Sequence, residues 1–305
     1  MVVAGPDPGH AFPAIALCLR FVAAGDTPIL LTGEQWLETA RAAGVDAVLL
    51  AGLDPQDGDD DGDAGAKIHH RAARMAELNV PILRSLAPEL VVSDVITVCG
   101  GMAAELLGLP WVELDPHPLY LPSKGLPPLG SGLAPGVGLR GRARDAVMRA
   151  LTARSVRDGD RQRAQARTGI GLPGRDPGPL RRLIATLPAL EVPRPDWPIE
   201  AVIVGPLHFE PTSDVLVLPA GDGPLVVVAP STATTGTGGL TELALQCLVP
   251  GRSLPEGARV AVSRLAGAEV DVPPWAVVGL GTAGAVLTGQ DAAGSGSGQQ
   301  RRHGE

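Results

Sequence analysis

The sequence predicts an α/β protein built around a doubly wound parallel sheet, and three observations support this fold class. Short aliphatic runs alternate with helical patterns through the first half of the chain, as in the strand–helix units of a parallel sheet. Aromatic residues are scarce (four Trp, one Tyr and three Phe), so the core must be aliphatic, which suits helices packed on such a sheet. Hydrophobic residues make up 45% and charged residues 19%, a globular composition.

The elements of the first half follow one another in the order that this class requires. We expect strands where a short aliphatic run lies between turn residues, and helices where apolar residues recur at helical spacing. The expected strands are 1–4, 28–32, 47–50, 89–93 and 111–114. The expected helices are 12–24, 35–43, 68–86 and 97–107, with a turn at 5–9 and a polar loop at 54–65.

The second half is less regular and predicts a boundary between two domains. Proline and glycine across 116–138 predict a long surface loop, and a basic amphipathic helix follows at 139–167. Further strands are expected at 183–187, 201–204, 225–229, 259–262 and 276–279, and a helix at 240–248. Periodicity is lost across 205–224. We therefore expect a complete first domain over 1–205, a partial Rossmann-like second domain over 206–281, and a disordered tail over 282–305.

Charge and cysteine usage exclude several classes of protein. A net charge of −8 argues against a nucleic-acid partner, because binding phosphates requires a basic face. Cys18, Cys99 and Cys247 lie far apart in apolar runs, which predicts buried reduced thiols rather than a disulfide framework or a zinc site. No apolar run approaches the roughly 20 residues of a membrane span, and no basic segment suggests a signal peptide. We therefore expect a cytoplasmic protein.

A histidine follows the first expected strand, in the segment GPDPGHAFP at 5–13. Ligands of open parallel sheets bind beyond the carboxyl ends of the strands, so His10 would lie in that crevice, just before the first helix. An imidazole, with an ordinary pKa of about 6.5, is suited to removing a proton from a hydroxyl. The alternative is that His10 is only a polar turn residue.

An aspartate ends the fourth expected strand, in the run VVSD at 91–94. A carboxylate at this position would lie in the same crevice as His10, where it would fix the tautomer of the imidazole and stabilise its protonated form. The alternative for Asp94 is an N-cap of the helix expected at 97–107.

Two further places carry candidate binding residues. The strand at 225–229 runs into the turn PSTATTG, where the hydroxyls of Ser231 and Thr232 and the backbone N–H groups would suit a phosphate. The alternative is a polar turn with an N-cap. His117, in the segment DPHP at 115–118, follows a strand end and is a candidate for the lining of a substrate pocket.

The segments that hold His10 and Asp94 resemble nucleotide-sugar glycosyltransferases of the GT-B fold, the relatives of plant flavonoid and bacterial macrolide glucosyltransferases. One segment runs from Gly9, His10 and Pro13 to the Gly-Asp pair at 25–26. The other is PELVVSD at 88–94, followed by AAELLGLP at 103–110. Both stand in the family's order.

The resemblance implies a fold, a reaction and roles for these residues. Residues 1–205 would be the acceptor-side domain and residues 206–281 part of the donor-side domain. His10 would be the general base on an acceptor hydroxyl, with Asp94 as its partner, and Ser231 and Thr232 would help to hold the donor diphosphate. The sugar would pass with inversion from a nucleoside-diphosphate sugar, a co-substrate rather than a cofactor, to a small hydroxylated acceptor.

The chain departs from this family at its C-terminal end. The family's donor segment contains a histidine and glycines at a helix N-terminus, an acidic residue and an Asp-Gln pair, and no segment with this pattern follows Gly279. We therefore expect a glycosyltransferase whose donor half is cut short. The alternative is a non-catalytic remnant or binding module.

Three other motifs are weaker signals. The GxGxxG run from Gly279 to Gly284 would suit a nicotinamide-dependent oxidoreductase, but it lacks a following helical pattern and an acidic residue on a second strand. The acidic run at 57–63 has Ile68 where a calcium loop needs a bidentate Glu, which predicts a solvated loop. His69 and His70 lie on an expected helix without a third ligand, so we expect no metal site.

Overall fold

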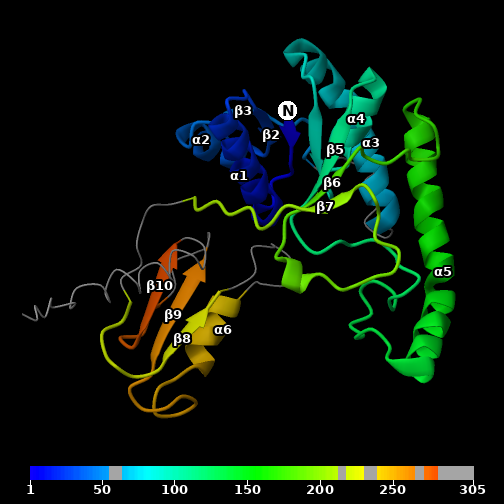
Figure 1. The fold of residues 1–305 in the computed structure, drawn as a ribbon. Coiled ribbons are helices and arrows are strands. Elements are labelled where there is room, and N and C mark those ends of the chain that lie inside the picture. Colours follow the sequence, from blue (N-terminus) through cyan, green and yellow to red (C-terminus); the bar gives the residue numbers. More distant parts are fainter. Residues whose placement is uncertain (55–63, 212–217, 230–238, 265–270, 281–305) are drawn as a thin grey trace, which may run out of the picture. The chain divides into compact units, whose positions relative to one another are not determined.

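The computed structural model describes residues 1–54, 64–211, 218–229, 239–264 and 271–280 (Figure 1). These residues form two compact units. The first unit contains Met1–Pro6 and His10–His208, and the second contains Asp7–Gly9 and the described residues that follow His208.

Seven parallel strands form the sheet of the first unit, in the order β3-β2-β1-β4-β5-β6-β7 (Figure 1). The strands are β1 (Val2–Val3), β2 (Ile29–Thr32), β3 (Asp46–Leu49), β4 (Val91–Asp94), β5 (Trp111–Asp115), β6 (Arg182–Ile184) and β7 (Ala201–Ile203). From β1 the chain builds outward through β2 and β3, then returns to β4 and builds in the opposite direction. The expected doubly wound α/β class is therefore confirmed, and its switch point lies between β1 and β4.

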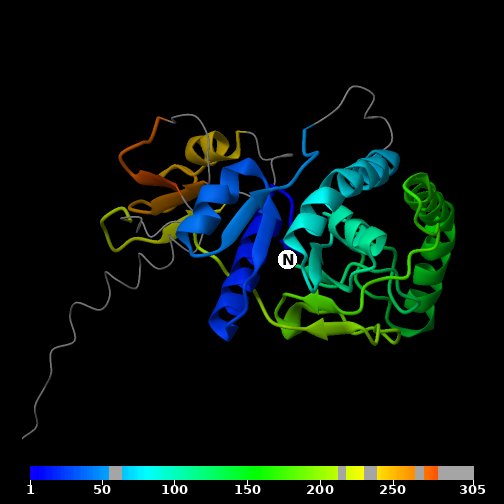
Figure 2. The same cartoon turned by 90° about the horizontal axis from the view of Figure 1, so that it is seen from above.

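Helices connect these strands. They are α1 (Pro8–Ala24), α2 (Glu34–Ala42), α3 (Ala64–Leu86), α4 (Cys99–Leu107) and α5 (Gly138–Gly169). α3 packs on both α4 and α5 (Figure 2). Their apolar side chains, Met75 and Met102 among them, form one buried cluster with Val3, Leu31 and Val91 of the central strands. The core is mostly aliphatic, as the scarcity of aromatic residues requires.

Two glycines let α4 approach the sheet closely. A Cβ on Gly100 would lie 2.8 Å from Oγ of Ser93 and 2.9 Å from Cβ of Val3. A Cβ on Gly101 would lie 3.0 Å from the ring of Trp111. Because these distances are shorter than ordinary van der Waals contact, the start of α4 packs on β4 and β5 only while both positions lack a side chain.

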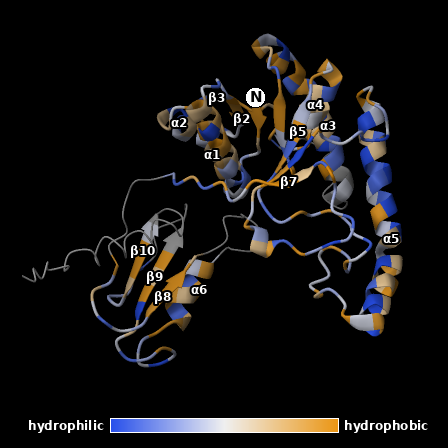
Figure 3. Ribbon diagram, viewed as in Figure 1, coloured by the Kyte–Doolittle hydropathy of each residue, from blue (hydrophilic) through white to orange (hydrophobic). Residues whose placement is uncertain are grey.

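The long helix α5 is held chiefly at its C-terminal end. Arg167, only 1% exposed, donates hydrogen bonds of 3.1 and 2.6 Å to the two carboxylate oxygens of Glu105 on α4 and one of 2.9 Å to the carbonyl of Pro173. Most of the remaining helix is exposed and hydrophilic (Figure 3). The helix expected at 139–167 is therefore present, but the amphipathic interpretation is wrong because no continuous apolar stripe of it is buried.

The loop between β5 and α5 is fixed by side chains from the segment that precedes β7. Arg194 donates hydrogen bonds of 2.8 Å to the carbonyls of Leu119 and Leu121. Asp196 accepts hydrogen bonds from the hydroxyl of Ser123 at 2.5 Å and from the N–H of Lys124 at 2.8 Å. The expected long loop is therefore a defined part of the first unit, tied down by charged side chains.

The second unit contains a three-stranded parallel sheet in the order β10-β9-β8. Its elements are β8 (Leu225–Val228), α6 (Leu240–Cys247), β9 (Arg259–Arg264) and β10 (Ala276–Leu280). Leu245, Val260 and Val262 lie at the centre of a small apolar core. The tail expected over 282–305 lies outside the described residues.

The glycine contacts of α4 give a test of this packing. We expect Gly100→Ala to lower the free energy of unfolding by about 1–3 kcal/mol, because its methyl group overlaps Ser93 and Val3. Gly159→Ala, inside α5 with no atom within 4 Å of the new Cβ, should raise that free energy by about 0.5–1 kcal/mol. Guanidinium-induced unfolding followed by circular dichroism measures both. Effects of the same sign would contradict this packing.

Candidate active site

The turns after β1 and β4 are joined by hydrogen bonds at the switch point of the sheet. β1 pairs with β4 in the register Val3↔Ser93, so Asp94 lies just beyond the end of β1. The N–H of Gly5 donates a 2.7 Å hydrogen bond to Oγ1 of Thr97, and the Thr97 hydroxyl donates one of 3.2 Å to Oδ1 of Asp94. The two turns are therefore locked together by buried polar groups.

The carboxylate of Asp94 makes a different set of contacts with each of its oxygens. It is 1% exposed, and its Oδ2 lies 2.7 Å from Nδ1 of His10. Its Oδ1 accepts hydrogen bonds from the N–H groups of Ile96 and Thr97, at 3.1 and 3.2 Å. Because α4 begins only at Cys99, with Val98 as an N-cap without a side-chain hydrogen bond, Asp94 caps the turn before the helix rather than the helix itself.

His10 stands in the first turn of α1, and this corrects the expected local structure. The turn predicted at 5–9 and the helix predicted from residue 12 are wrong at this point, because α1 already begins at Pro8. Proline suits the first turn of a helix, where its missing N–H costs nothing, and Oδ1 of Asp7 accepts a 2.9 Å hydrogen bond from the N–H of Gly9. The helix backbone thus fixes the direction in which His10 points.

The contact between His10 and Asp94 decides the tautomer of the imidazole. A carboxylate only accepts hydrogen bonds, so Nδ1 of His10 carries a proton, and in the neutral form of the ring the lone pair is on Nε2. The His10 side chain is 16% exposed and that of Asp94 is fully buried. An imidazole held in this way is able to accept a proton at Nε2, and the Asp94 carboxylate stabilises the resulting positive charge.

A second carboxyl group, which the sequence reasoning missed, lies at the same edge of the sheet. Asp115 ends β5 beside Asp94, is 2% exposed, and no described residue donates a hydrogen bond to its Oδ2. Burial raises the pKa of Asp115 to about 6; His117 opposes that rise, and Asp94 and Glu191 add to it. The sequence did offer one signal for this residue, because Asp115 directly follows the expected strand at 111–114, as an acidic residue at a strand end.

His117 lies close to His10, at the position where its segment was expected. The two ring centroids are 6.3 Å apart with the planes at 80°, and the ring of Tyr120 lies at 6.3 Å on the other side of His117. Nδ1 of His117 donates a 2.8 Å hydrogen bond to the carbonyl of Pro118. The structure thus places His117 beside His10. Its role toward an acceptor stays a prediction.

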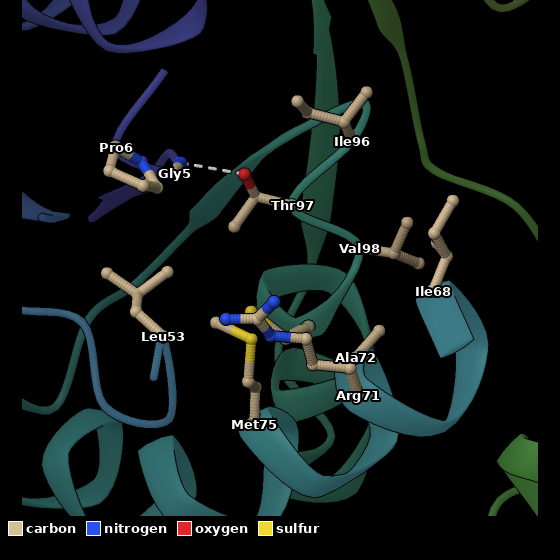
Figure 4. Close-up of a pocket in the computed structure, with 11 residues that line it drawn as sticks. Gly5, Pro6, Leu53, Ile68, Arg71, Ala72, Met75, Ile96, Thr97 and Val98 are labelled. Atoms are coloured by element: carbon tan, nitrogen blue, oxygen red, sulfur yellow. Dashed lines mark hydrogen bonds between the residues drawn. The ribbon is translucent and has the colours of Figure 1, made fainter. Parts of the chain in front are cut away.

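An apolar cavity of about 220 Å³ adjoins this arrangement (Figure 4). Its walls are the turn after β1, the turn after β4, and the face of α3 that carries Arg71 and Met75. Thr97, whose hydroxyl binds Asp94, is part of the wall. The cavity and the His10–Asp94 pair are therefore connected through one residue, whereas His10 and His117 do not line the cavity itself.

The other candidate residues lie elsewhere or outside the described part of the chain. Ser231 and Thr232 are outside the described residues, as are the acidic run at 57–63 and Gly281 and Gly284 of the glycine motif. His69 is half-buried and His70 exposed on α3. Among the described residues, no three His, Cys, Asp or Glu side chains gather closely enough to hold a metal ion.

The three cysteines are free thiols in two environments. Cys18 and Cys99 are buried as expected, and burial raises the pKa of each thiol to about 12, which leaves them unreactive. Cys247 on α6 is exposed, so the expectation of a buried thiol there is wrong. None of the described helices has the length and apolar character needed to cross a membrane.

Sequence comparison finds a synthase and a glycosyl transferase as relatives, although no protein-family model matches the chain. 4'-Demethylrebeccamycin synthase of Lentzea aerocolonigenes is 28% identical over 233 residues, which cover 68% of this chain and 55% of that protein. L-demethylnoviosyl transferase of Streptomyces niveus is 31% identical over 134 residues, covering 37% of this chain and 35% of that protein. The chain thus spans about half the length, or less, of these curated relatives.

Solved structures with the same fold are also glycosyltransferases. The kitacinnamycin glycosyltransferase matches 91% of this chain and 69% of its own, with a TM-score of 0.61 and 19% identity. SsfS6 of Streptomyces sp. SF2575, complexed with thymidine diphosphate, matches 94% of this chain and 72% of its own, with a TM-score of 0.59 and 17% identity. At these identities the likeness establishes the fold.

The doubly wound first unit, the smaller parallel sheet and these matches define the GT-B class of fold. The chain is a relative of the GT-B nucleotide-sugar glycosyltransferases, and the resemblance seen in its sequence is confirmed.

The buried carboxyl of Asp115 predicts a stability change that depends on pH. Because the pKa of Asp115 is raised, the folded state binds the proton of this carboxyl more tightly than the unfolded state does. The stability that the protonated carboxyl contributes is therefore complete below about pH 4 and is lost as the pH rises through about 6. The change in unfolding free energy caused by Asp115→Asn should therefore be more stabilising above pH 6 than near pH 4. The difference between the two should be at most about 3 kcal/mol.

Unfolding of both proteins by denaturant across this pH range measures the difference. Asp196→Asn is the matched control, because hydrogen bonds from Ser123 and Lys124 lower the pKa of Asp196 and reverse the sign. An effect of Asp115→Asn that is equal near pH 4 and above pH 6 would show that the carboxyl ionises freely in the folded protein.

Proposed function

We propose that this chain binds and activates the acceptor in a glycosyltransferase reaction, in which a sugar passes from a nucleoside-diphosphate sugar to a hydroxyl of a small molecule. The observation that carries the proposal is the 2.7 Å contact between His10 and Asp94 at the switch point of the sheet. Ligands of doubly wound folds bind at this point, and a paired histidine there is suited to removing a proton.

The proposed chemistry is a single displacement. Nε2 of His10 takes the proton of the acceptor hydroxyl, and Asp94 stabilises the imidazolium that forms. The oxygen lone pair forms the new bond to the anomeric carbon of the sugar, while the bond from that carbon to the diphosphate breaks and its electrons leave with the phosphate oxygen. Attack opposite the leaving group inverts the configuration at the anomeric carbon.

The relatives support the proposed substrates. SsfS6 was solved with thymidine diphosphate, and the rhamnosyltransferase SpnG with spinosyn aglycone. By analogy we propose a nucleoside-diphosphate sugar as the donor and a small hydroxylated aglycone as the acceptor. In this proposal Ser231 and Thr232 contact the donor diphosphate and His117 contacts the acceptor. The donor is consumed as a co-substrate, and the reaction as proposed uses no other cofactor.

A histidine substitution tests the proposed base. Wild-type protein, His10→Ala and the control His70→Ala, exposed on α3, are incubated with UDP-glucose or TDP-glucose and a panel of hydroxylated aromatic acceptors. Mass spectrometry of the glycosylated product gives the rate. His10→Ala should slow transfer by about 10²–10⁴-fold, because the general base is lost, while His70→Ala should leave the rate unchanged.

Two outcomes would overturn parts of this proposal. Transfer that survives His10→Ala undiminished removes His10 as the base. Titration of the two donors by calorimetry decides between transfer and the alternative of a non-catalytic binding module: micromolar donor binding contradicts the module, and no donor binding contradicts the transferase.

A further inference from the structure

One charged side chain stands among the apolar residues that line the cavity beside Thr97. Figure 4 shows the guanidinium of Arg71 extending from α3 toward the middle of the lining residues. Met75 and Ala72, from the same face of α3, are buried, and Leu53 and Ile96 complete the apolar surroundings. Arg71 as a whole is half-buried, and its neighbours in this lining are hydrocarbon side chains.

Three other buried or half-buried arginines of the first unit are neutralised or hydrogen-bonded within the protein. Arg167 binds Glu105, Arg182 pairs with Glu113, and Arg194 donates to two loop carbonyls. Within the described residues, by contrast, Arg71 has neither an ion pair nor a hydrogen bond. Thr97 also lines the cavity, but its hydroxyl already accepts a hydrogen bond from the N–H of Gly5 and donates one to Asp94. Arg71 is thus the donor that the cavity leaves available to a ligand.

The chemistry of this group defines what it would bind. A guanidinium presents a planar fork of N–H donors that matches a carboxylate, and such charge-assisted hydrogen bonds are about twice as strong as neutral ones. The apolar walls favour a hydrocarbon ring. Because the cavity, at about 220 Å³, is smaller than the ~300–1,000 Å³ of ordinary ligand pockets, it suits one portion of a ligand rather than a whole large molecule.

We propose that Arg71 selects acceptors that carry a carboxylate, or a comparably acidic oxygen, on an apolar ring system that enters this cavity. The acidic group binds the guanidinium, and the reacting hydroxyl lies toward His10, on the other side of the Thr97 turn. The role of this molecule as an acceptor rests on the proposed function. Its binding at Arg71 does not.

The test compares two probes that differ only in the acidic group. Calorimetry measures the binding of 6-hydroxy-2-naphthoate and of 2-naphthol, near neutral pH, to wild-type protein and to Arg71→Gln, Arg71→Lys and Arg84→Gln. The last variant is the control, because Arg84 is exposed on the same helix and does not line the cavity. Wild-type protein should bind the naphthoate at least about tenfold more tightly than the naphthol.

The variants should separate charge from geometry. Arg71→Gln should abolish the preference for the naphthoate while 2-naphthol still binds, Arg71→Lys should keep part of it, and Arg84→Gln should keep all of it. Equal affinities for the two probes in the wild-type protein, a preference that persists in Arg71→Gln, or no binding of either probe would overturn the proposal.

Failure of this proposal differs from failure of the proposed function. The probe preference is a binding measurement that needs neither donor nor turnover. A naphthoate preference without sugar transfer would keep the Arg71 site and reject the transferase. Sugar transfer to both probes, without a difference in their affinities, would support the transferase and reject the Arg71 site.

Discussion

The carboxylate of Asp94 is the constraint on which the candidate site depends. One of its oxygens binds the imidazole of His10, and the other is held by the N–H groups of the turn after β4. Thr97 carries the same network across to the backbone of Gly5, in the turn before α1. Two segments more than eighty residues apart in sequence are therefore fixed to each other by buried hydrogen bonds, and this pairing exists because β1 and β4 are neighbours at the reversal of the strand order.

The polar groups and the apolar cavity of the site lie on different sides of this network. On one side, the rings of His10 and His117 lie edge to face, and the carboxyl groups of Asp94 and Asp115 end the adjacent strands β4 and β5. Asp94 is satisfied by hydrogen bonds, whereas Asp115 has no described donor to its Oδ2, and burial raises the pKa of Asp115 to about 6. On the other side, beyond Thr97, an apolar cavity holds one guanidinium. Such an arrangement suits an amphipathic small molecule better than a sugar polymer or a nucleic acid.

His10 and Asp94 could be predicted from the sequence, because ligands of parallel sheets bind beyond the carboxyl ends of the strands and both residues follow such ends. The order of the elements around them could be predicted as well. The start of α1 was missed because proline and glycine at 5–9 favour a turn, although Pro8 equally suits a first helical turn. Asp115 was missed because its significance lies in its burial and in the nearby charge of Glu191, which is distant in sequence. Arg71 was missed because the turn after β4, also distant in sequence, completes the cavity around it. Ser231 and Thr232 stay predictions because they lie outside the described residues.

The most direct test of this account is the tautomer of His10, observed by nitrogen NMR of histidine-labelled protein at a pH high enough for the ring to give the spectrum of a neutral imidazole. If Asp94 orients the base, Nδ1 of His10 gives the signal of a protonated ring nitrogen and Nε2 that of an unprotonated one, and Asp94→Asn removes this preference. A proton on Nε2 in the wild-type protein, or the same spectrum in Asp94→Asn, would contradict the central claim that this carboxylate prepares His10 to accept a proton.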